Sequence, residues 1–164
     1  MGVLCELFSA TESDVNELQP EDIPSRRFGG VEAKGLNPVP FAALHHILTG
    51  IDIQESVRLH SLVAEITEDG PWIYRLPREL ASTLAELSQR GIDSVAAEWT
   101  KTDELQLAGW SYDDVNSVRS RMVALCQHPD IEGMTIFLWS SIGLVSSLRE
   151  RRFVRTSLRL PFRD

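Results

Sequence analysis

The run Met-Thr-Ile-Phe-Leu-Trp at residues 134–139 is apolar at both sets of alternating positions. A strand with two apolar faces has to be covered on both sides, so it normally lies in the interior of a sheet. Residues 3–8 and 72–76 are shorter β-prone runs that can supply neighbouring strands. Residues 62–66 are predicted to form a hairpin with 72–76, although residues 59–66 are also compatible with a helix.

Helix signals lie between these strands. Five segments combine apolar residues at three- and four-residue spacing with recognisable ends: 11–19, 37–50, 77–91, 94–100 and 111–127. Thr11 and Ser111 each stand three residues before an aspartate, which is a capping-box pattern. Gly91 is predicted to end its helix. Residues 19–37, rich in proline and glycine, and the acidic link 101–109 are predicted to be irregular.

These elements predict an α+β fold. Residues 1–141 are expected to form a single domain, in which four to five helices pack on a small mixed sheet with strands near 3–8, 72–76, 134–140 and, where the hairpin forms, 62–66. Residues 142–164 are basic, with six arginines against one glutamate and one aspartate. Apolar residues alternate with these arginines, which favours a segment that packs on this domain or on a neighbouring subunit over a solvated arm that binds nucleic acid.

Composition excludes several classes of function. The formal charge of −8 argues against a nucleic-acid-binding protein, because such binding relies on clustered Lys and Arg. No apolar run approaches the ~20 residues that span a bilayer, and the amino terminus lacks the pattern of a signal peptide. The only two cysteines, Cys5 and Cys126, fit reduced core thiols. We therefore expect a cytoplasmic protein without membrane or nucleic-acid partners.

His45 is the one candidate catalytic residue. It borders the apolar stripe of the predicted helix 37–50, where a half-buried histidine bonded to a backbone carbonyl is the commoner role. His46 points about 100° away from it, and His60 and His128 lie in unrelated segments, so no metal-ligand spacing is present. Neither cysteine has the basic or helix-N-terminal setting of a reactive thiolate. No nucleotide, metal or other cofactor motif occurs, and none is expected.

Candidate binding residues lie in the loop and before the last helix. Arg26, Arg27 and Lys34 accompany glycines in residues 26–35, which could cradle a phosphate through backbone N–H groups, although a turn-rich loop is the commoner meaning of this composition. Trp110 is one of four tryptophans that could line a groove, but that are more often core residues.

Several short motifs resemble the YfbM-like family of small bacterial proteins of unknown function. They are Met1-Gly2 with the first strand, Leu44-His45 followed by Leu48-Thr49-Gly50, Tyr74-Arg75-Leu76 before Pro77, the helix after Trp110, and Phe137-Leu138-Trp139. The resemblance covers most of the chain up to Ile142. It implies an α+β fold and a bacterial cytoplasmic setting, and it supplies no catalytic residues.

The expected function is that of a non-catalytic protein-binding or regulatory domain, of which an immunity protein is one concrete form. The partner would be another protein or a second copy of this chain. The alternative is a small-molecule enzyme, hydrolase-like, with His45 as acid or base. An open polar cavity at His45 would favour the enzyme, whereas a packed His45 would favour the binding protein.

Overall fold

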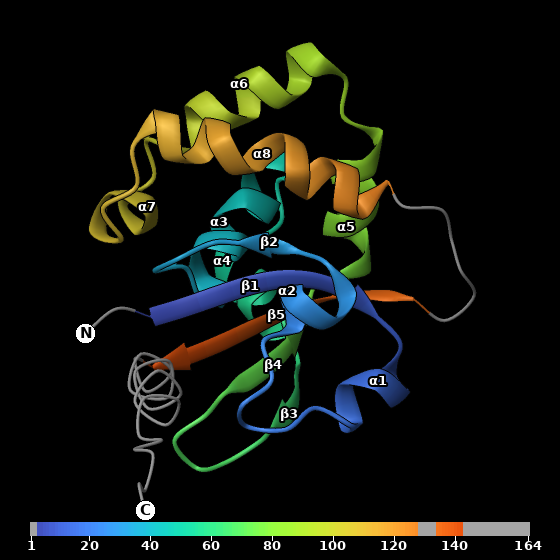
Figure 1. The fold of residues 1–164 in the computed structure, drawn as a ribbon. Helices are drawn as coiled ribbons and strands as arrows, with labels where there is room; N and C mark the ends of the chain where they lie inside the picture. Colours follow the sequence, from blue (N-terminus) through green and yellow to red (C-terminus); the bar gives the residue numbers. More distant parts are fainter. Residues whose placement is uncertain (1–2, 128–133, 143–164) are drawn as a thin grey trace, which may run out of the picture.

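The computed structural model describes residues 3–127 and 134–142, which form a five-stranded sheet with helices on both faces (Figure 1). In chain order the elements are β1 (Val3–Ala10), α1 (Glu12–Asn16), α2 (Pro24–Phe28), β2 (Val31–Glu32), α3 (Pro38–Thr49), α4 (Ile53–Leu59), β3 (Leu62–Glu65), β4 (Trp72–Arg75), α5 (Arg78–Glu86), α6 (Gln89–Trp99), α7 (Asp103–Leu107), α8 (Tyr112–Cys126) and β5 (Thr135–Ile142). The α+β prediction is confirmed.

The sheet has the strand order β2-β1-β5-β4-β3. The doubly apolar run is β5, and it occupies the centre as its sequence predicts. All four pairings are antiparallel, so the sheet is not mixed as predicted. β1 and β5 pair along eight residues, with Glu6 opposite Trp139 and Phe8 opposite Phe137. The hairpin of β3 and β4 forms, and the helical alternative for residues 59–66 is wrong beyond Leu59.

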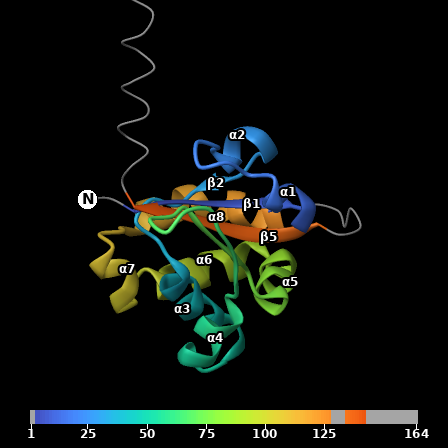
Figure 2. The same cartoon turned by 90° about the horizontal axis from the view of Figure 1, so that it is seen from below.

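The two faces of the sheet carry covers of unequal thickness (Figure 2). One face packs on α3 and α5 to α8, and its core includes Leu7 and Leu138 together with Trp99. The other face packs on α1 and α2 and the chain between them, and its core includes Phe8, Phe137 and Trp139. Alternate residues of β1 and β5 thus enter opposite cores, which explains why both strands are apolar on both faces.

Local capping explains where several helices begin. Thr11 forms a reciprocal capping box with Asp14, and Ser111 forms one with Asp114, as predicted. The Asn37 side chain accepts from the N–H of Val39 at the start of α3. α3 then ends at Gly50, which adopts the left-handed φ of 78° that favours glycine.

The helix count was underestimated, because the described residues contain eight helices rather than four or five. Gly91 does not end a helix: the Ser88 hydroxyl accepts its N–H and so starts α6 there, after α5 has stopped at Glu86. The predicted irregular stretches contain α2, β2 and α7, and α4 has no counterpart in the prediction. All four are short, so their apolar repeats span too few residues to stand out.

The predicted domain boundary falls inside an element. β5 continues through Ile142, which pairs with Val3, so the sheet reaches one residue beyond the predicted domain of residues 1–141. The last helix is predicted to end at residue 127, and α8 ends at Cys126. The basic segment beyond Ile142 lies outside the described residues.

Candidate functional site

His45 joins three helices in the thicker layer of the fold. Its side chain is 0% exposed, so it is fully buried rather than half-buried as predicted. The ring Nδ1 lies 2.8 Å from Oγ of Ser56 on α4. The ring Nε2 lies 3.6 Å from Oε2 of Glu79 on α5. The expected backbone-carbonyl partner is therefore replaced by a serine hydroxyl.

His60 belongs to the same cluster, although the sequence places it in an unrelated segment. Its Nδ1 lies 2.8 Å from the carbonyl oxygen of Ser56. Because a carbonyl can only accept, His60 carries a proton on Nδ1. Within the described residues, Nε2 of His45 and Nε2 of His60 are buried without a hydrogen-bond partner. Ser56 was missed by sequence reasoning, and the four-residue spacing from Ser56 to His60 was its only signal.

The environment keeps both imidazoles neutral near pH 7. Burial lowers the pKa of His45, and the Glu79 carboxylate opposes this only in part. Burial also lowers the pKa of His60, against the effect of its hydrogen bond to Ser56. Two neighbouring histidines that were both charged would repel one another inside the core.

A serine, a histidine and a carboxylate in one row are the components of an acyl-transfer site. Here, however, the Ser56 side chain is fully buried. Neither of the two cavities described below is lined by Ser56 or His45. A nucleophile needs a position about 3 Å away for the reacting atom, whereas Ser56 is 0% exposed to solvent. The cluster is suited to holding α3, α4 and α5 together.

The two cysteines are also unsuited to nucleophilic chemistry. Both are free thiols, as predicted. Burial, with the adjacent Glu6 carboxylate, raises the pKa of Cys5 well above its usual range. Burial raises the pKa of Cys126 to about 12. Both side chains therefore stay protonated at neutral pH, and the thiolate is the reactive form.

The four candidate binding residues do not form one site. Arg27 lies on α2, where its guanidinium pairs with Glu17 and stacks near Phe28. Arg26 is exposed on the same short helix. Lys34 and Trp110 do meet, because the Trp110 indole N–H donates to the Lys34 carbonyl at 2.7 Å. Of these three cations, only Lys34 lines either of the two cavities described below.

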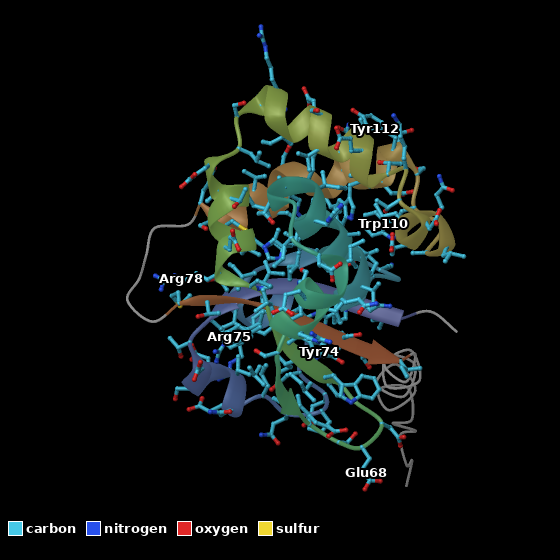
Figure 3. All side chains as sticks on the ribbon, turned by 180° about the vertical axis from the view of Figure 1, so that it is seen from behind. Glu68, Tyr74, Arg75, Arg78, Trp110 and Tyr112 are labelled. Carbon is cyan, nitrogen blue, oxygen red and sulfur yellow. The ribbon has the colours of Figure 1, made fainter. Side chains whose placement is uncertain are left out.

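The junction of α7 and α8 presents an exposed apolar surface. Leu107 ends α7 with its side chain 89% exposed, and Tyr112 begins α8 at 44% exposed. Trp110 lies between them in the chain and is partly buried against the core. Figure 3 shows Trp110 and Tyr112 on the same side of the molecule, beside α7. We call Leu107, Trp110 and Tyr112 the junction surface.

Acidic residues flank the junction surface. Asp103 and Glu104 start α7, and Asp113 and Asp114 lie in the first turn of α8. Hydrogen bonds from Ser111 lower the pKa of the Asp114 carboxyl, which caps α8 as predicted. In the part of the chain that the structure describes, no group of three or more His, Cys, Asp or Glu side chains is placed to hold a metal ion.

A polar cavity of about 60 Å³ lies beside β1 on the thinner face of the fold. Its lining consists of Leu4, Cys5, Glu6, Ile23, Glu32, Lys34 and Trp139. Glu6 is only 6% exposed, and its Oε2 accepts from the N–H of Ser25 at 2.9 Å. A second cavity, about 20 Å³ between α3, α5, α6 and α8, is largely apolar and has the size of one or two waters.

Sequence reasoning did not identify Glu6 as a candidate. The available signal was a carboxylate in an otherwise apolar strand, since a charged residue on a covered face needs a partner.

Comparison with known proteins gives no family assignment. No family model matches the chain, and no curated protein and no solved structure matches it. The resemblance to the YfbM-like family therefore stays a prediction. Among the described helices, none has both the length and the apolar character needed to cross a membrane.

Proposed function

We propose that this chain is a non-catalytic protein-binding domain that contacts its partner through the junction surface. The observation that carries the proposal is the 89% exposure of Leu107, which lies three residues before Trp110 and five residues before the exposed Tyr112. Trp110 is anchored by its hydrogen bond to the Lys34 carbonyl. Tyr and Trp are enriched at protein interfaces, and clustered exposed apolar side chains mark such sites. Leu107 contributes nothing to the core. A contact with another molecule would explain an exposed leucine side chain at this position.

The surroundings of the junction surface define the partner's chemistry. Asp103, Glu104 and Asp113 give an apolar centre an acidic border. Such a surface complements an apolar patch bordered by Lys and Arg, and opposite charge would speed association and exclude acidic proteins. A regulatory or immunity-type domain that covers a basic surface of its target fits this description.

The enzyme alternative needed an open polar cavity at His45. The His45 side chain is instead fully buried and bonded to Ser56, and it lines neither of the two cavities described above. The geometry at His45 therefore does not support the enzyme alternative.

The test is site-specific photo-crosslinking in living cells of the protein's source. A photoreactive amino acid at position 107 is compared with one at Ser94, an exposed position on α6. We expect one dominant adduct from position 107 and none from position 94, followed by identification of the adduct by mass spectrometry. Equal adducts at both positions, or none at position 107, would refute the proposal.

Affinity measurements with the purified partner then assign the contact. Leu107→Asp should weaken binding at least about tenfold, because it removes an apolar contact and adds charge. Ser94→Asp adds the same charge elsewhere and should leave the dissociation constant unchanged. If sedimentation shows that the partner is a second copy, the same two variants decide whether the junction surface forms the dimer.

A further inference from the structure

The register of the sheet places two carboxylates next to each other at the polar cavity. Glu6 on β1 is directly opposite Glu32 on β2 and, on its other side, opposite Trp139 on β5. Residues directly opposite in antiparallel strands project from the same face, so Glu32, Glu6 and Trp139 form one row across three strands. Like charges in that arrangement repel, and a cation between them would remove the repulsion.

One carboxylate oxygen of Glu6 accepts a hydrogen bond within the fold, and the other does not. Oε2 accepts from Ser25 and so caps α2, while Oε1 has no hydrogen-bond partner among the described residues. The side chain is more than nine-tenths buried and lines the cavity. Oε1 is not among the buried side-chain atoms that lack a partner in the described residues, so it reaches open space and is available to a hydrogen-bond donor that enters the cavity. Lys34 also lines the cavity. Among the described residues, its ammonium group forms no ion pair with the carboxylate of Glu6 or of Glu32.

The cavity has the dimensions and chemistry for a guanidinium group. Its volume of about 60 Å³ holds roughly four water-sized atoms, and a guanidinium has four heavy atoms. A planar guanidinium donates in parallel to carboxylate oxygens and stacks on aromatic rings, which an ammonium does less well. Glu6 and Glu32 would accept its N–H groups, and Trp139, which also lines the cavity, offers an aromatic side chain beside it.

We propose that this cavity binds a guanidinium group, and that the occupant is an arginine of residues 143–164 of the same chain. The segment begins at Ile142, which pairs with Val3 only three residues from the row of Glu6 and Trp139. Three residues of strand span about 10 Å, and the first arginine of the segment follows seven residues after Ile142, so every arginine in it can reach the cavity.

Charge supports the same occupant. Six arginines against one glutamate and one aspartate give residues 143–164 a net charge of +4, so the chain's −8 leaves −12 for residues 1–142. An acidic body and a tethered basic segment attract one another, and the tether makes the encounter intramolecular. The site is distinct from the junction surface, so its test is independent of the proposed function.

The first experiment observes the arginine side chains of the full chain by ¹H–¹⁵N NMR. We expect one arginine Nε–H signal from residues 143–164 to be shifted and protected from exchange, and to return to the free position in Glu6→Gln. Glutamine can still accept from Ser25, so the cap of α2 is preserved. Glu68→Gln, an exposed carboxylate in the β3–β4 turn, is the matched control and should change nothing (Figure 3).

The second experiment separates the sources of the guanidinium. In a full-length variant with all six arginines of residues 143–164 replaced by glutamine, the cavity is expected to be vacant. A synthetic peptide of residues 143–164 and ethylguanidinium should then bind this variant, and adding Glu6→Gln should weaken the peptide at least about tenfold. The wild-type chain should bind either probe far more weakly, because its own arginine competes.

Three results would overturn the proposal. The first is a set of segment arginine signals that all stay at the free position in the wild-type chain. The second is a peptide affinity that does not change with Glu6→Gln. The third is a protected arginine signal that disappears on dilution, which would make the occupant a second copy and refute the intrachain assignment. Circular dichroism and thermal unfolding of each variant establish that a negative result comes from a folded protein.

Discussion

The His45 cluster and the Glu6 cavity both place ionisable side chains inside the fold, but they differ in what faces the remaining polar atoms. At His45, packed side chains surround the ring, and its uncharged form is favoured. At Glu6, the second carboxylate oxygen borders open space. A buried polar group that is closed in contributes to the architecture, whereas one that faces a cavity is available to a ligand.

The thickness of the two covers explains the difference. α3, α4 and α5 surround His45, and the Ser56 hydroxyl and carbonyl link the two histidines between them. The face that carries Glu6 is covered by two five-residue helices and irregular chain, which cannot fill the space beside a short β2. Four predictions test whether the two sites differ in this way.

The largest effect is expected from His45→Ala. The substitution empties a packed position and leaves the Ser56 hydroxyl without its partner, so the free energy of unfolding should fall by about 2–4 kcal/mol. The neighbouring His46 is exposed and makes one bond to the Ile51 carbonyl, so His46→Ala should cost at most about 1 kcal/mol. Urea denaturation measures both. Equal losses would mean that the His45 cluster is not a structural element.

The second prediction concerns acid. Because His45 and His60 have lowered pKa values in the folded state, the unfolded chain binds more protons as the pH falls below about 6.5. Stability should be constant between about pH 7 and 8 and should decrease below about 6.5 by up to about 1.4 kcal/mol per pH unit for each histidine, until the folded-state pKa is passed. Above about pH 8.5 it should decrease again, because the thiols of Cys5 and Cys126 ionise more readily in the unfolded chain.

Denaturation between pH 5 and 8 isolates this effect. The capping hydrogen bonds lower the carboxyl pKa values of Asp14 and Asp114. Their contribution to the stability of the fold is therefore lost only at lower pH, where these carboxylates become protonated. His45→Gln should remove about half of the slope. A slope that is unchanged in this variant would show that His45 does not titrate with unfolding.

The third prediction is a smaller loss at the open site. Glu6→Gln keeps the acceptor for Ser25 and removes only the charge, and solvent can reach the guanidinium that it releases. The free energy of unfolding of the full chain should fall by about 1 kcal/mol, well below the cost of His45→Ala. Parallel urea curves with an unchanged slope establish the comparison. A cost as large as that of His45→Ala would mean that Glu6 is closed in like the histidine.

The sequence predicted the architecture better than either site. Apolar alternation identified the central strand, and capping residues such as Ser111 identified helix starts, because both signals are local. The meeting of His45 with His60 depends on how α3 packs on α4, and α4 is too short for a clear apolar repeat. Glu6 faces Glu32 only because the chain after α1 forms β2 and pairs with β1. No local sequence pattern predicts that strand.

The smallest effect concerns Glu32→Gln, where the sign of the change is more informative than its size. If a guanidinium lies between the two carboxylates, removing the Glu32 charge weakens an attraction and should destabilise the full chain by about 0.5 kcal/mol. In the variant without arginines in residues 143–164, the same substitution relieves the repulsion between Glu32 and Glu6 and should stabilise by a similar amount. The two measurements form a double-mutant cycle whose coupling isolates the contact. If Glu32→Gln changes the free energy of unfolding in the same direction in both backgrounds, no cation from this segment enters the cavity. Changes in opposite directions require such a cation, because only a third charge can turn a repulsive pair of carboxylates into a stabilising arrangement.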